Sequence, residues 1–268
     1  METARPVTAD IDILPSYFPI PGFGLIPVNA FVLKAQQPVL VDTGLHQDRE
    51  QFIAALSSVI DPSDLRWIWL THPDQDHVGA LQTLINSFPR IRVITTFLGF
   101  GILSLFGPLP ADRVYFLNPG EELDVGDRRL VCLRPPSFDN PATTALYDTK
   151  SRALFSSDCF GALLQSPAEE AFAISPSDLR EGQVLWGTVD APWLHKVDET
   201  KFATELDSIQ KLDPVVVLSS HLPPARAMLG QLLNNLADVP KAPVFTGPSQ
   251  AAFEAMVAQM TQGTPNSP

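Results

Sequence analysis

Residues 72–77 have the side-chain types and the spacing of a metal-binding cluster. The segment reads H-P-D-Q-D-H and holds four potential ligands, which are His72, Asp74, Asp76 and His77. It follows a predicted apolar strand and opens a predicted amphipathic helix. In an extended segment, His72, Asp74 and Asp76 occupy alternating positions and can point the same way. His77 then turns inward as the helix begins.

Helix capping is an alternative explanation for part of this segment. Asp74 or Asp76 could cap the helix, and Thr71 and Pro73 are typical of a helix start. Capping accounts for one aspartate, but not for a second one together with two histidines. Clusters of His and Asp at ligand spacing mark metal sites. The segment therefore predicts a metal site at the end of a strand, where α/β sheets usually hold ligands.

Composition narrows the class of protein. The chain has 268 residues with 30 acidic and 18 basic side chains, so its formal net charge is −12. Hydrophobic residues make up 45%, which favours a soluble globular protein. The negative charge counts against a nucleic-acid partner. Two cysteines cannot form a thiolate-only zinc site. We find no secretory signal and no spanning apolar segment, and so expect a cytoplasmic protein without a membrane partner.

The elements that must position this cluster follow a recognisable order. Strands and helices alternate first, the middle of the chain is rich in short strands, and a helix–strand–helix pattern follows. Because each apolar strand needs cover on both faces, we expect an α/β fold with a four-layer αββα sandwich. One domain is expected over 1–268, with a polar tail at 261–268 that frays. Segment 161–189, which includes Trp186, is expected to cover the cleft.

At this point the sequence resembles the metallo-β-lactamase fold superfamily. Its His-x-His-x-Asp-His signature corresponds to residues 72–77. Three further landmarks occur in the family's order. The early Asp-Thr-Gly turn corresponds to residues 42–44. One later strand ends at Asp158, the family's metal-bridging aspartate, and another ends at His221, the family's last histidine. The resemblance runs from about residue 29 to residue 221, which is most of the chain.

Two departures from the family's pattern change the expected site. The second histidine of the signature is replaced by Asp74. The family's third histidine usually lies in a Pro-Gly-His turn, and Phe138 stands at the matching place. Asp139 is a possible substitute ligand, although a shift of one residue should turn its side chain elsewhere.

The resemblance implies two metal ions that share Asp158. Position one would be held by Asp76, His77, His221 and Asp158. Position two would have His72, Asp74 and Asp158, and it lacks one imidazole. Asp42 is predicted to orient a ligand imidazole. No catalytic residue can be assigned.

Three imidazoles with three carboxylates favour iron, with zinc or manganese possible, because carboxylate ligands shift metal preference away from zinc. The flavodiiron and oxygen-binding di-iron proteins of this superfamily carry an acidic residue at the signature's second histidine. That branch uses Glu where this chain has Asp74.

Three functions follow from this resemblance. The first is a di-iron redox or oxygen-binding protein, with O₂ or a small oxidant as its substrate. Since no flavin domain is expected in this chain, a separate partner would donate electrons. The second is a metal-dependent hydrolase of a small ester, thioester, lactone or phosphodiester. The third is a non-catalytic sensor or binding protein that keeps a degenerate site, which Phe138 favours.

Overall fold

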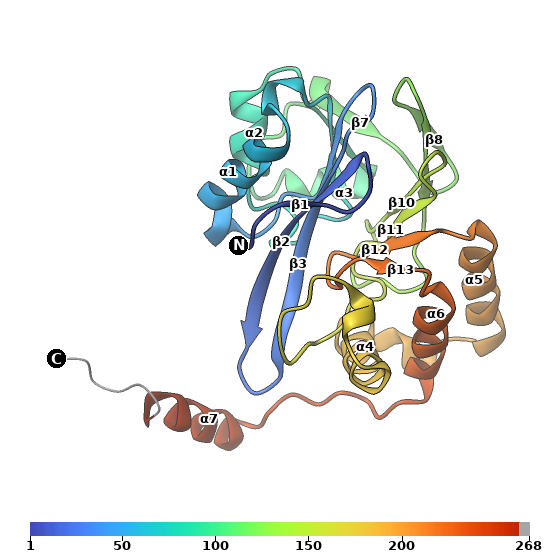
Figure 1. Cartoon of the computed structure of the whole chain (residues 1–268). Coiled ribbons are helices and arrows are strands. Elements are labelled where there is room, and N and C mark those ends of the chain that lie inside the picture. Colours follow the sequence, from blue (N-terminus) through green and yellow to red (C-terminus); the bar gives the residue numbers. More distant parts are fainter. Residues whose placement is uncertain (263–268) are drawn as a thin grey trace.

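Two β-sheets pack face to face between two layers of helices, as the computed structural model shows (Figure 1). The structure describes residues 1–262. Residues 263–268 of the predicted tail lie outside the described part, whereas Thr261 and Gln262 belong to the last helix, α7 (Gln250–Gln262). Within residues 1–262, no helix has the length and apolar character that crossing a membrane requires.

The first sheet contains seven strands in chain order. They are β1 (Arg5–Pro6), β2 (Ile11–Ile20), β3 (Gly24–Leu33), β4 (Val39–Val41), β5 (Trp67–Trp69), β6 (Arg92–Thr95) and β7 (Val114–Phe116). The first four strands run antiparallel, and β4 to β7 run parallel. Each parallel pair is joined through one helix, in the order α1 (Arg49–Val59), α2 (Leu81–Ser87) and α3 (Phe97–Leu103).

The second sheet has six strands in the order β13-β12-β11-β10-β9-β8. They are β8 (Glu122–Asp124), β9 (Arg129–Leu133), β10 (Ala145–Asp148), β11 (Ala153–Phe155), β12 (Val216–Leu218) and β13 (Ala225–Arg226). Two helices join the parallel pair β11 and β12, namely α4 (Pro176–Asp190) and α5 (Glu199–Leu212), and α6 (Leu229–Asp238) follows β13. Short 3-10 turns lie at His46–Asp48, Pro62–Asp64, Ala111–Arg113, Ala171–Ala173, Pro192–Lys196 and Val239–Lys241.

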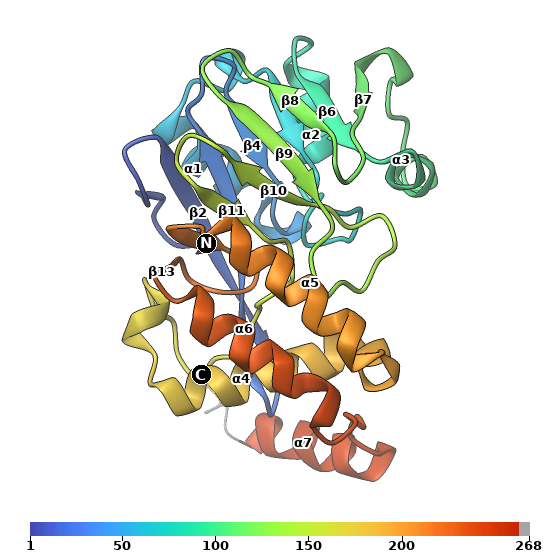
Figure 2. The same ribbon diagram turned by 90° about the vertical axis from the view of Figure 1, so that its right-hand side faces the viewer.

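Alternation along the strands explains the four layers. Val39 and Val41 of β4 lie in the core between the sheets, whereas Leu40 packs with Phe52 of α1 on the outer face. Strand β12 does the same, because Val217 packs toward α5 and α6 while its neighbours enter the central core. Figure 2 shows α5 and α6 lying over the second sheet. Both faces of each sheet are buried, so the αββα expectation is confirmed.

The segment after β5 differs from the sequence expectation. Residues 72–74 have no regular secondary structure, residues 75–80 form turns, and the helix begins at Leu81 rather than at His77. Backbone hydrogen bonds explain the late start, because His77 N donates to the Asp74 carbonyl at 3.0 Å and Gly79 N donates to the Gly44 carbonyl at 2.8 Å. These bonds bind the signature segment to the 42–44 turn, so His77 is placed by a turn and not by a helix.

Two other elements were not expected from the sequence. Segment 161–189 contains a regular helix, α4, that begins at a Ser175 cap, whose side chain accepts a hydrogen bond from Asp178 N at 3.2 Å. Strand β2 pairs with β3 over ten residue positions, and these two strands form the long hairpin seen in Figure 1. Strand β2 was not predicted because its two prolines and its polar residues interrupt the apolar pattern that is typical of a strand.

Candidate metal centre

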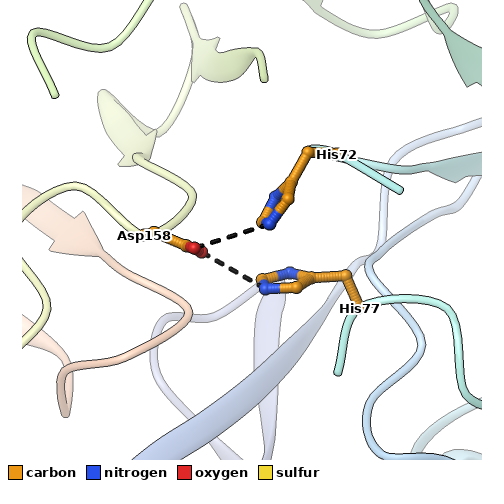
Figure 3. A group of neighbouring side chains, drawn as sticks. All are labelled: His72, His77 and Asp158. Carbon is orange, nitrogen blue, oxygen red and sulfur yellow. Dashed lines mark ion pairs between the residues drawn. The ribbon is translucent and has the colours of Figure 1, made fainter. Parts of the chain in front are cut away.

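The predicted donor residues converge where strands of both sheets end. His72 follows β5, Asp158 follows β11, and His221 follows β12. In Figure 3, the rings of His72 and His77 and the Asp158 carboxylate point toward one another, with Asp158 on the opposite side from the two histidines. All three side chains are buried. The centre is therefore assembled from both halves of the fold.

The geometry of position one suits a single cation. The Nε2 atoms of His77 and His221 each lie 3.2 Å from Asp158 Oδ1. Asp76 Oδ2 lies 3.5 Å from each of the same nitrogens. Two donors bound at about 2.1 Å to one ion, and separated by about 90–110°, lie about 3.0–3.4 Å apart. The four nitrogen–oxygen distances, at 3.2–3.5 Å, thus nearly match the separation of neighbouring donors around one ion.

Position two is more open. His72 Nε2 lies 3.4 Å from Asp158 Oδ2, 3.8 Å from Asp139 Oδ1 and 4.0 Å from Asp74 Oδ2. Asp158 therefore presents a different oxygen to each position, as a bridging carboxylate does. Asn140 Nδ2 donates to Asp74 Oδ1 at 3.0 Å and holds that carboxylate in place.

Asp139 reaches the centre although Phe138 does not. The Phe138 ring lies 5.0 Å from the Trp193 ring, and its carbonyl accepts a hydrogen bond from Trp193 Nε1 at 2.7 Å. The expected reversal of side-chain direction assumed strand alternation. Between Leu133 and Ala145 the chain forms turns instead, so a shift of one residue does not turn the Asp139 side chain away.

Hydrogen bonds on Nδ1 fix the imidazoles that face position one. Asp42 Oδ2 lies 2.9 Å from His77 Nδ1, and the Pro27 carbonyl oxygen lies 2.7 Å from His221 Nδ1. An acceptor at Nδ1 requires the proton there and leaves Nε2 free as a ligand atom. Asp42 thus occupies the place of an orienting carboxylate.

Several polar atoms of the centre are buried without a partner. Among the described residues, His72 Nε2, His77 Nε2 and Asp158 Oδ1 have no hydrogen bond. An unpaired buried polar group costs about 1–3 kcal/mol. Their lone pairs face one another, and a cation between them would remove this cost. The donor set therefore fits a pair of metal ions.

The pKa values reflect the crowding of charges. Burial alone would lower the pKa of His221, but the Asp158 and Asp76 carboxylates outweigh it and raise the pKa to about 9. Burial would raise the pKa of Asp158, but His72, His221 and His77 hold it well below its ordinary range. Burial and the neighbouring Asp158 and Asp74 raise the pKa of Asp139 to about 7. In the metal-free protein, protons therefore take the place that cations would fill.

Two residues of the centre come from α4. Trp186 Nε1 donates to the Asp158 carbonyl at 3.2 Å, and its ring lies 4.9 Å from the His221 ring. Asp190 has a carboxylate oxygen within 4.8 Å of donor atoms of Asp139 and Asp158. Sequence analysis placed Trp186 near the cleft but missed Asp190, because helix α4 was not recognised. The spacing of four between them was the available signal.

An apolar groove lies beside the centre at Asp76. It has a volume of about 470 Å³ and is lined by Phe18, Ile26, Val28, Leu45, His46, Gln47, Gln75 and Asp76. The Asp76 side chain is 31% exposed, whereas those of His77 and His221 are 1% exposed. The centre is therefore open to solvent at Asp76, whereas its imidazoles are enclosed.

Two packed sheets between helical layers, with His and Asp donors at the strand ends, define a metallo-β-lactamase-like fold. Comparison with known families supports this class. The model described as ODP family beta lactamase matches residues 26–205, which is more than half of the chain. The chain belongs to this family.

Solved structures share the fold. The rubredoxin oxygen:oxidoreductase from Desulfovibrio gigas superposes with a TM-score of 0.76 at 19% identity, over 89% of this chain and 61% of that chain. The flavodiiron protein from Giardia intestinalis gives a TM-score of 0.76 at 14% identity, over 90% of this chain and 60% of that chain.

Sequence relatives match in part. An uncharacterized protein of Methanocaldococcus jannaschii is 25% identical over 193 residues, which is 72% of this chain and 48% of that protein. The anaerobic nitric oxide reductase flavorubredoxin of Salmonella typhi is 29% identical over 50% of this chain and 28% of its own length. The chain thus spans from about a quarter to about half the length of these curated relatives.

Proposed function

We propose that this chain holds two iron ions and binds or reduces a small oxidant such as O₂ or nitric oxide. Position one would be held by Asp76, His77, His221 and Asp158. The observation that carries the proposal is the set of buried donor atoms on His72, His77 and Asp158 that face one another without a hydrogen bond in the described part of the chain, because a bound cation would satisfy all of them. The names of the relatives, which include a nitric oxide reductase and an oxygen oxidoreductase, favour redox chemistry over hydrolysis.

Iron, when bound, would supply one-electron chemistry to a small molecule at the open side of the centre. The residues of this chain would position the metal ligands and would favour small uncharged molecules over polar ones. Asp42 and the Pro27 carbonyl orient two imidazoles. The apolar groove beside Asp76 suits a small uncharged molecule better than a polar ester. Electrons would come from a separate donor, because both cysteines are buried and unpaired thiols whose pKa values burial raises to about 12.

Metal analysis under anaerobic conditions tests this function. Protein purified without added metal, and then loaded with Fe²⁺, should contain about two ions per chain. It should also develop visible absorption that changes on exposure to O₂. The variant His221→Ala should lose the ion of position one, whereas His195→Ala, which lies outside the cluster, should retain both. Binding of zinc alone, with no oxygen-sensitive absorption after iron loading, would refute the proposal.

A further inference from the structure

The last turn of α4 faces the centre. Trp186 contacts both Asp158 and His221, and Asp190 lies four residues later on the same side of the helix. The Asp190 carboxylate lies with those of Asp139 and Asp158, so that one oxygen from each is within 4.8 Å of the others. A carboxylate therefore lies beside Asp139 and Asp158, two of the carboxylates of position two, on a helix that carries no predicted ligand.

Asp190 has no ion-pair partner within residues 1–262, and the last turn of α4 has no basic residue. The C-terminal end of a helix carries partial negative charge, which disfavours an acid there. A cation between the carboxylates would offset both the repulsion among the carboxylates and the unfavourable position of an acid at a helix C-terminus.

A second observation points to the same place. His72 Nε2 is directed toward Asp158, its side chain is 1% exposed, and it has no hydrogen-bond partner within residues 1–262. A buried ring nitrogen that faces a group of carboxylates is a ligand atom without its ion. Position two therefore has a nitrogen donor that faces Asp139 and Asp158, the two carboxylates that lie near Asp190.

The two positions differ in their donors. Position one combines two imidazoles with the carboxylates of Asp76 and Asp158. Position two has the single imidazole of His72, and its carboxylates are Asp74, Asp139 and Asp158. Imidazole favours iron and zinc, whereas carboxylate oxygens favour manganese and other hard divalent cations.

We propose that Asp190 is an additional oxygen donor of position two, and that the ratio of Mn²⁺ to Fe²⁺ bound from an equal mixture is therefore higher at position two than at position one. The proposal rests on the two-metal function above. At most N/O sites Fe²⁺ binds more tightly than Mn²⁺, so the relevant quantity is the ratio of the two metals at each position.

Site-resolved metal occupancy tests this inference. Metal-free full-length protein is loaded anaerobically with Mn²⁺ and Fe²⁺ at equal concentrations and crystallised. Anomalous scattering at the two absorption edges then reports the Mn:Fe ratio at each position, and the Mn²⁺ electron paramagnetic resonance signal reports binding in solution. We expect a higher ratio at position two.

Variants separate the role of Asp190 from general effects on folding. Asp190→Asn should weaken Mn²⁺ binding at position two by about 10- to 100-fold and leave the ion at position one in place. Asp190→Glu, which retains a carboxylate, should restore part of the binding. Asp207→Asn, an exposed change on α5, serves as the matched control and should bind both metals as wild type does.

The outcomes distinguish this inference from the proposed function. Equal Mn:Fe ratios at the two filled positions, or full Mn²⁺ binding by Asp190→Asn, would overturn the role of Asp190 while leaving the two-metal function standing. Absence of metal from both positions of the wild type would instead overturn the two-metal function, and this inference with it.

Discussion

Replacement of Asp42 by Asn should test how the protein controls its ligand imidazoles. Asp42 is 1% exposed and accepts hydrogen bonds through both oxygens. Oδ1 accepts from Thr71 N at 2.8 Å, and Oδ2 lies 2.9 Å from both Thr71 Oγ1 and His77 Nδ1. Asp42 has a left-handed backbone with φ of 58°, which Asn tolerates. The substitution therefore changes donors and acceptors with little change in shape.

The expected loss of metal affinity follows from the two orientations that the Asn amide can take. If its carbonyl still accepts from Thr71 N, its NH₂ group faces His77 Nδ1. The ring proton must then move to Nε2, where it blocks the metal. If the amide is reversed, its NH₂ group faces the Thr71 N–H, and a buried donor loses its acceptor at a cost of about 1–3 kcal/mol. Loss of an orienting partner weakens metal binding about 10- to 100-fold, or about 1.4–2.7 kcal/mol.

A chelator competition assay measures this change. The metal dissociation constant of Asp42→Asn is compared with that of wild type and of Asp213→Asn. Asp213 is a matched control because it is also left-handed, with φ of 47°, and is exposed at the end of α5. Wild-type metal affinity in Asp42→Asn, with unchanged urea unfolding, would show that Asp42 does not set the His77 proton position.

Three further predictions concern packing and charge. Gly161→Ala places a Cβ atom 2.8 Å from His221 Cβ, so it should cost about 1–3 kcal/mol and lower the metal content measured by mass spectrometry; full metal content would contradict this. Arg128→Met leaves Asp148, which is 0% exposed, without its cation at 3.0 Å, and should lower the free energy of urea unfolding by about 3–5 kcal/mol; an unchanged midpoint would argue against it. The metal-free protein should lose stability as the pH rises from about 6.5 to 9. Folding raises the pKa values of His221 and Asp190 to about 9. Over this range the folded protein therefore still holds protons that the unfolded chain has already released. Urea unfolding of chelator-treated protein at several pH values measures this, and stability that increases over the range would refute it.

Much of the fold and most of the candidate centre could be predicted from the sequence. Apolar strands such as β5 and β12 are easily predicted from the sequence, because both of their faces are buried and every position is hydrophobic. The residues that follow these strands carry the chemistry, because polar donors at the end of a buried strand are set apart from its apolar run. His72 and His221 follow strands of different sheets, and the resemblance to the metallo-β-lactamase superfamily, rather than a shared sheet edge, predicted that they belong to one centre.

Only the tertiary structure decided how the remaining donors reach the centre. Asp139 faces it because its segment forms turns rather than a strand, and no periodic pattern records such a conformation. Asp190 faces it because α4 packs its last turn against Asp158 and His221. The spacing of four from Trp186 places both residues on one side of a helix, but it does not record what that side packs against. The sequence by itself determined which donors stand at the strand ends, because strand periodicity is local. The number of carboxylates that share the centre was decided by long-range packing between turns and a helix.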